Sequence, residues 1–192
     1  MKRVWIAFFG IILILNFLSA ERIHRNIKEN VIRLHIVANS NSKGDQAFKL
    51  SVRDYVLNHY GKTLSASNKK EALKAIKASI PAMETDLKQQ FKQNIRITLS
   101  ETDFPTKQYN GVRLPQGNYT ALSIKIGAAK GKNWWCIMYP SLCFSDLSIE
   151  TNQNKMKEVL NDTEFKTVTA DKGKVLYKFK AVELWNKFKK LF

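Results

Sequence analysis

Both cysteines and two of the four tryptophans of this 192-residue chain lie in one short segment, residues 130–144. If one straight strand joined Cys136 to Cys143, their Cα atoms would lie roughly 23 Å apart, too far for a disulfide. A turn between Tyr139 and Pro140 instead places the cysteines opposite each other in a hairpin, and it fits best with a cis bond before the proline. The segment therefore predicts a tight hairpin that holds either a disulfide or two free, buried thiols.

The composition indicates one ordinary globular domain with a strongly basic surface. The length suffices for a single core and hardly for two. With 32 Lys and Arg against 16 Asp and Glu, the net charge is +16, which favours anionic partners such as lipid head groups, cell-wall polymers or an acidic protein. The charge is spread along the chain with no run of arginine, so we expect no nucleic-acid partner.

The N-terminus indicates export. Lys2 and Arg3 precede an apolar run over residues 4–18. This run resembles the core of a signal peptide and is shorter than the ~20 residues that span a bilayer. Ala20 suits a cleavage site but Leu18 does not, so residues 1–20 form either a cleaved signal or a retained anchor. Outside the reducing cytosol, a pair of cysteines favours a disulfide.

Alternation and helical periodicity predict an α+β fold. Residues 31–38 alternate as a half-buried strand, with Arg33 and His35 on the less apolar face. Ser42 is expected to cap a helix that ends at Gly61. A second helix should start near Asn68, where Pro81 would later kink or divide it.

Further strands are expected at residues 95–99 and 119–126, with a loop at 103–118. A hairpin turn at residues 127–133 leads into a fourth strand that carries the tryptophans. We expect a single domain with a roughly four-stranded, mainly antiparallel sheet, packed with two or three helices. The chain is predicted to comprise four parts: a signal or anchor at 1–20, a basic linker or short helix at 21–30, an α+β core at 31–144, and a polar connector with a basic amphipathic C-terminal segment at 145–192. That last segment could dock on the core or lie on a membrane surface.

No pattern in the sequence points to catalysis, a metal or a cofactor. A G-x-S-x-G nucleophile motif is absent. His24, His35 and His59 lie far apart, without the spacing of metal ligands. Nothing places a base beside either cysteine. We therefore expect a protein that is not an enzyme, with no catalytic, cofactor-binding or metal-binding residues.

Neighbouring residues on a strand point to opposite faces, so Trp134 and Trp135 cannot both fill one core. One should pack in the core, while the other stays exposed or packs under a helix. If it is exposed beside Lys130 and Lys132, it would suit partner binding, because tryptophan dominates binding hot spots. These four residues are the candidate interaction site.

Three blocks of sequence resemble the stage II sporulation protein R family of endospore-forming bacteria. They comprise residues 31–40, residues 45–54, and residues 117–122 together with 130–144, where the run Asn-Trp-Trp-Cys is the most specific part. The chain departs from the family pattern at Ser141, where a second proline is expected.

The resemblance implies an exported signalling protein. Such proteins are made in the forespore and cross its membrane into the space that faces the mother cell. There they trigger a membrane-embedded aspartic protease to process the precursor of the early mother-cell sigma factor. The residues alone leave an alternative open, an extracytoplasmic basic module that binds an anionic cell wall or membrane surface.

Overall fold

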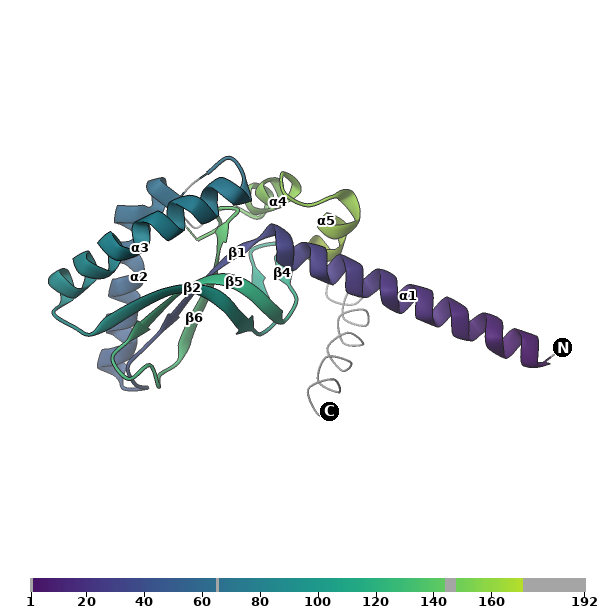
Figure 1. Cartoon of the computed structure of the whole chain (residues 1–192), viewed down its shortest axis with the longest axis horizontal. Coiled ribbons are helices and arrows are strands. Elements are labelled where there is room, and N and C mark those ends of the chain that lie inside the picture. Colours follow the sequence, from purple (N-terminus) through teal and green to yellow (C-terminus); the bar gives the residue numbers. More distant parts are fainter. Residues whose placement is uncertain (1, 65, 144–147, 171–192) are drawn as a thin grey trace.

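The computed structural model describes residues 2–64, 66–143 and 148–170, and Figure 1 shows their arrangement. A central sheet carries two long helices on one face, while smaller elements cover part of the other. The expected amphipathic C-terminal segment falls mostly outside the described residues.

The sheet has the strand order β2-β5-β1-β6. Its members are β1 (Ile32–Val37), β2 (Ile95–Phe104), β5 (Gly117–Ile126) and β6 (Asn133–Tyr139). Strand β1 runs parallel to β5 and antiparallel to β6, whereas β2 and β5 form a long antiparallel pair. The predicted α+β class, with a four-stranded and mainly antiparallel sheet, is confirmed.

Strand β1 is more buried than the alternation predicted. All six of its residues are buried, and Arg33 has no exposed surface. The expectation of a half-buried strand was wrong because β1 lies between two other strands and has packed layers on both faces. Polar residues at alternate positions suggested a solvated face, but here they lie under a second core.

One face of the sheet packs against α2 (Lys43–Leu64) and α3 (Lys69–Phe91). The predicted caps are present, because the Asp45 amide donates to Ser42 Oγ at 3.1 Å and the Glu71 amide to Asn68 Oδ1 at 3.0 Å. One detail differs from expectation, because α2 continues past Gly61 to residue 64. Helix α3 is continuous with Pro81 inside it, so of the two expected effects of this proline, division of the helix is ruled out.

The second core lies on the opposite face and is built from elements that the pattern did not predict. The expected loop at 103–118 contains a small hairpin, β3 (Lys107–Tyr109) and β4 (Val112–Leu114). The expected polar connector contains α4 (Ile149–Lys157) and α5 (Asp162–Thr169). Their buried residues Met156 and Val168 join this core, so the packed part of the chain continues beyond residue 144.

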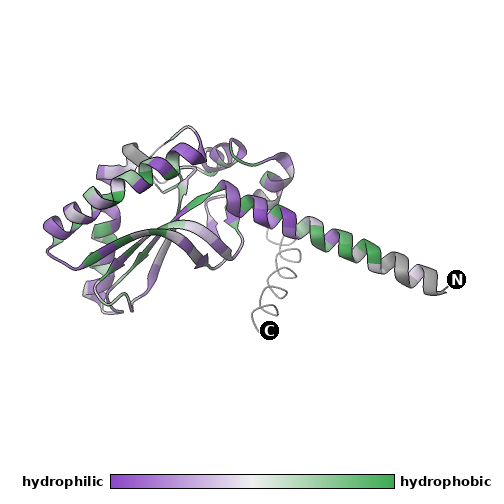
Figure 2. Cartoon of the chain, in the orientation of Figure 1, coloured by the Kyte–Doolittle hydropathy of each residue, from purple (hydrophilic) through white to green (hydrophobic). Residues whose placement is uncertain are grey.

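Helix α1 (Lys2–Asn30) runs without a break through the expected signal segment and the expected linker. Its C-terminal part belongs to the second core, where Ile27 has no exposed surface. Its N-terminal part extends away from the domain, with exposed apolar residues such as Leu15 and Leu18 (Figures 1 and 2). Within the described residues, no helix combines the length and apolarity needed to cross a membrane.

Candidate interaction surface

The two cysteines form a disulfide at the end of β6. The Cα atoms of Cys136 and Cys143 lie 5.8 Å apart. The pairing of residues across the turn is the one expected from the sequence, because the amide of Leu142 donates to the carbonyl of Ile137 at 3.2 Å. The peptide bond before Pro140 is cis. Both thiols are bonded to each other, so neither is a free nucleophile in this structure.

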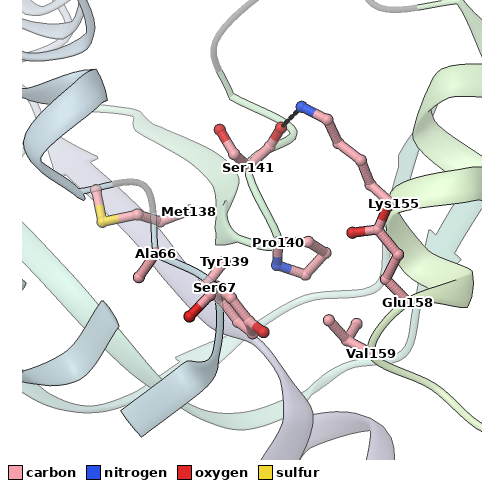
Figure 3. A pocket seen from close by; sticks show the side chains of 9 residues that line it. All are labelled: Ala66, Ser67, Met138, Tyr139, Pro140, Ser141, Lys155, Glu158 and Val159. Atoms are coloured by element: carbon pink, nitrogen blue, oxygen red, sulfur yellow. Dashed lines mark hydrogen bonds between the residues drawn. The ribbon is translucent and has the colours of Figure 1, made fainter. Parts of the chain in front are cut away.

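Neighbouring helices hold the disulfide turn in place. Lys155 of α4 donates from Nζ to the carbonyl of Ser141 at 2.6 Å. A small hollow of about 200 Å³ lies between the turn, Ser67 near the start of α3, and Glu158 after α4 (Figure 3). The position of the turn therefore depends on α4, a helix that the sequence pattern did not predict.

The basic turn before β6 is tied to the loop that follows β1. The Lys130 amide donates to the carbonyl of Asn39 at 3.0 Å, and the Gly131 amide to that of Ala38 at 2.9 Å. A Cβ atom at position 131 would collide with the carbonyl of Ser40, so glycine is required by this close approach. The turn is thus a rigid platform at one end of the sheet.

Both lysines of this turn, Lys130 and Lys132, are exposed. The carbonyl of Lys132 accepts a hydrogen bond from Nζ of the buried Lys49 at 3.1 Å. Burial lowers the pKa of Lys49, and the nearby positive charges of Arg53 and Lys132 lower it further. Positive charge is therefore concentrated beneath and around the turn.

The two tryptophans point to opposite faces, as predicted, and both are half-buried. Trp134 packs against the core under α2 and α3, with the guanidinium carbon of Arg53 5.4 Å from its ring centroid. Trp135 lies on the other face, where its ring stacks on His35 with centroids 4.0 Å apart and planes within 7°. Neither tryptophan side chain is fully buried and neither is fully exposed. Contact of either tryptophan with a partner stays a prediction.

Next to Trp135 lies a buried arginine that the sequence reasoning missed. The guanidinium carbon of Arg33 sits 4.2 Å from the ring centroid of Phe104 and 4.9 Å from that of Tyr119. Its Nε donates to the carbonyl of Cys136 at 2.8 Å, and Nη2 to the hydroxyl of Tyr109 at 2.5 Å. Its Nη1 has no hydrogen-bond partner. Burial lowers the pKa of this guanidinium.

This cluster connects β1 to the β3–β4 hairpin and to the disulfide strand. The one sequence feature related to this cluster is the alternation of Arg33 with apolar residues. The same pattern is typical of a strand with one solvent-exposed face, so it could not predict that Arg33 is buried. The cluster has aromatic rings where a buried cation usually has a carboxylate, so cation–π attraction replaces an ion pair. We interpret it as the centre of the second core.

The described residues show no group of three or more His, Cys, Asp and Glu side chains that could hold a metal ion. His24 donates from Nε2 to the carbonyl of Gln116 at 2.8 Å, and His35 donates from Nε2 to Asn133 Oδ1 at 2.8 Å. Each histidine has a structural partner. The surface thus presents cationic and aromatic groups whose positions are fixed by the contacts described above.

Comparison with known proteins identifies the family of this chain. The family model of stage II sporulation protein R matches residues 28–149 of the chain. The chain belongs to the stage II sporulation protein R family. The match spans all six strands, α2, α3, the disulfide and both tryptophans, which is the part that holds the candidate surface.

A stage II sporulation protein R from Bacillus subtilis (strain 168) is 34% identical over 166 residues, covering 77% of this chain and 72% of the relative. No solved structure gave a significant match. Membership of the stage II sporulation protein R family assigns the chain a role in sporulation.

Proposed function

We propose that this protein is an exported signal of endospore formation that triggers a membrane-embedded aspartic protease to process the precursor of the early mother-cell sigma factor. The observation that carries the proposal is the family match over residues 28–149. The finer mechanism follows from what the family resemblance implies. The protein leaves the forespore and acts in the space that faces the mother cell.

In this proposal, catalysis belongs to the partner. The protein supplies a surface that binds the active state of the protease more tightly than the inactive state, and this difference in affinity shifts the equilibrium. The platform of Lys130 and Lys132 is suited to such contact because its backbone is anchored and its side chains are at the surface. The disulfide suits an oxidising compartment outside the cytoplasm.

Reconstitution tests this function directly. The full chain is co-expressed with the candidate protease and the sigma-factor precursor in cells that lack the native sporulation pathway, and precursor cleavage is followed by immunoblotting. Processing is expected only when all three are present. A protease variant without its catalytic aspartate is the matched control, and processing in its presence would disprove the assigned route.

A second candidate function is binding of an anionic cell-wall polymer or membrane surface through the basic faces. The net charge of +16 and the exposed apolar residues of α1 favour it. Co-sedimentation with purified cell walls or anionic vesicles, in the absence of the protease, distinguishes the two. Tight wall binding together with no effect on precursor processing would favour this second function.

A further inference from the structure

The sheet face opposite α2 and α3 is covered at one end only. The second core occupies the end that contains Phe104 and Tyr119. At the other end, Arg96 of β2, Lys125 of β5 and Asn133 of β6 are all exposed. No helix or strand of the described residues packs over these three side chains, which surround a hollow of about 550 Å³.

Two cations face each other in this hollow. Arg96 and Lys125 are direct neighbours across the antiparallel β2–β5 pair. Like charges at such positions destabilise a sheet. Among the described residues the ion pairs are Arg53 with Asp54 and Lys88 with Glu84, so neither cation of the hollow forms an ion pair. The carboxylate of Glu84 attracts Arg96 from a longer distance. An anionic ligand placed between them would relieve the repulsion.

The rest of the hollow is lined by polar residues such as Asn94 and by small apolar residues such as Val37 and Ala128. His35 lines it and is held by two contacts, its hydrogen bond to Asn133 and its stacking on Trp135. The turn with Gly127 and Ala129, both with positive φ, closes one side. Aromatic residues and arginine are enriched in protein–protein interfaces, and a positive patch favours a negatively charged partner surface, so paired cations beside a ring suit an acidic protein segment.

The direction of α1 argues against one lipid ligand, a head group of the membrane at its apolar end. The exposed apolar residues of α1 extend from one end of the molecule, whereas the β5–β6 turn lies at the opposite end of the long axis (Figure 1). If the apolar end of α1 marks the membrane side, the hollow faces away from the bilayer. A lipid head group of that bilayer would then be out of reach of the hollow.

We propose that this hollow binds an acidic segment of the protein partner, with carboxylates paired to Arg96 and Lys125. The proposal rests on the proposed function for the existence of that partner. It adds a second contact region to the Lys130–Lys132 platform, since Ala129 and Asn133, which flank the platform in the sequence, line the hollow. Trp134, on the helix-covered face, lies outside this surface.

The test uses the full chain and the double charge reversal Arg96→Glu/Lys125→Glu. The matched control is Lys70→Glu/Lys77→Glu, which makes the same change in net charge at two exposed positions of α3. Binding of an oligoglutamate peptide is measured by calorimetry, and precursor processing by the reconstituted assay. The hollow variant should bind roughly tenfold more weakly or worse and lose processing, while the control keeps both.

Thermal melting monitored by circular dichroism checks folding, and Arg96→Gln/Lys125→Gln replaces the reversal if that variant melts early. Wild-type affinity in the hollow variant, or an equal loss in the control, would overturn the proposal. So would loss of binding to phosphatidylglycerol vesicles by the hollow variant without loss of peptide binding. If even the wild type triggers no processing, the proposed function fails, and the calorimetric difference alone decides whether the hollow binds carboxylates.

Discussion

The guanidinium of Arg33 lies over the ring of Phe104 at 4.2 Å, with no exposed surface on the arginine. The contact joins the inner strand β1 to the C-terminal end of the edge strand β2, across the intervening strand β5. An arginine is rarely buried without a carboxylate, because desolvating its charge is costly. Here the cost is offset by aromatic faces and two hydrogen bonds.

Replacing Arg33 should therefore destabilise the fold. Arg33→Ala removes both hydrogen bonds and leaves a cavity among the rings, so we expect a loss of about 3–5 kcal/mol in the free energy of unfolding. Arg33→Met should lose less, because its side chain fills the space and no charge is buried. Urea unfolding of both variants measures this, with exposed Arg22→Ala as control. Equal stability of Arg33→Ala and wild type would contradict the structural role.

The disulfide should make a measurable contribution to stability. Closing the eight-residue loop from Cys136 to Cys143 contributes about 2.5 kcal/mol in the chain-entropy model. We expect reduction with dithiothreitol to lower the denaturation midpoint accordingly, and mass spectrometry of the unreduced protein to show the loss of two hydrogens. The Cys136→Ala/Cys143→Ala variant should be insensitive to the reductant. A wild-type midpoint that does not change on reduction would refute the contribution.

Replacing each tryptophan should affect stability similarly but affect signalling differently. Both are half-buried, so each change to alanine should cost about 2 kcal/mol, less than for a fully buried ring. Trp135→Ala should also abolish precursor processing under conditions where the variant stays folded, because Trp135 lies beside the hollow. Trp134→Ala should keep processing. Equal activity of the two folded variants would rule out Trp135 as a partner contact.

Acid should destabilise the protein through His24. Burial, and then the positive charge of Lys28, lower its pKa from 6.5 to about 4. Between these values the unfolded chain binds more protons than the folded one, so the free energy of unfolding falls as pH drops from 6.5. The loss should reach about 3 kcal/mol near pH 4. Burial lowers the pKa of His35 too, so it contributes in the same direction.

Denaturation midpoints of wild type and His24→Gln, measured from pH 7 to pH 4, test this assignment. The glutamine amide can still donate to the carbonyl of Gln116 but does not titrate. The variant should therefore show a shallower fall in stability across this range. Parallel curves for the two proteins would show that other groups cause the acid sensitivity.

Local patterns in the sequence determined α2, α3, the four strands of the central sheet and the disulfide hairpin. Ser42 and Asn68 cap α2 and α3 because a side-chain oxygen satisfies a backbone amide of the first turn, which needs only neighbouring residues. The opposition of Cys136 and Cys143 follows from the two-residue period of a strand and one turn. The opposite orientation of the tryptophans has the same cause.

The tertiary structure decided which polar residues are buried and which are exposed. Arg33 and Arg96 both alternate with apolar residues in a strand, yet one lies at the centre of a core and the other lines an open hollow. The difference arises because α4, α5 and the β3–β4 hairpin pack over the end of the sheet that holds Arg33 and not over the end that holds Arg96. This packing depends on contacts between residues far apart in the sequence. The facing of Arg96 and Lys125 likewise depends on strand pairing between distant segments, and alternation within one strand carries no information about its neighbour.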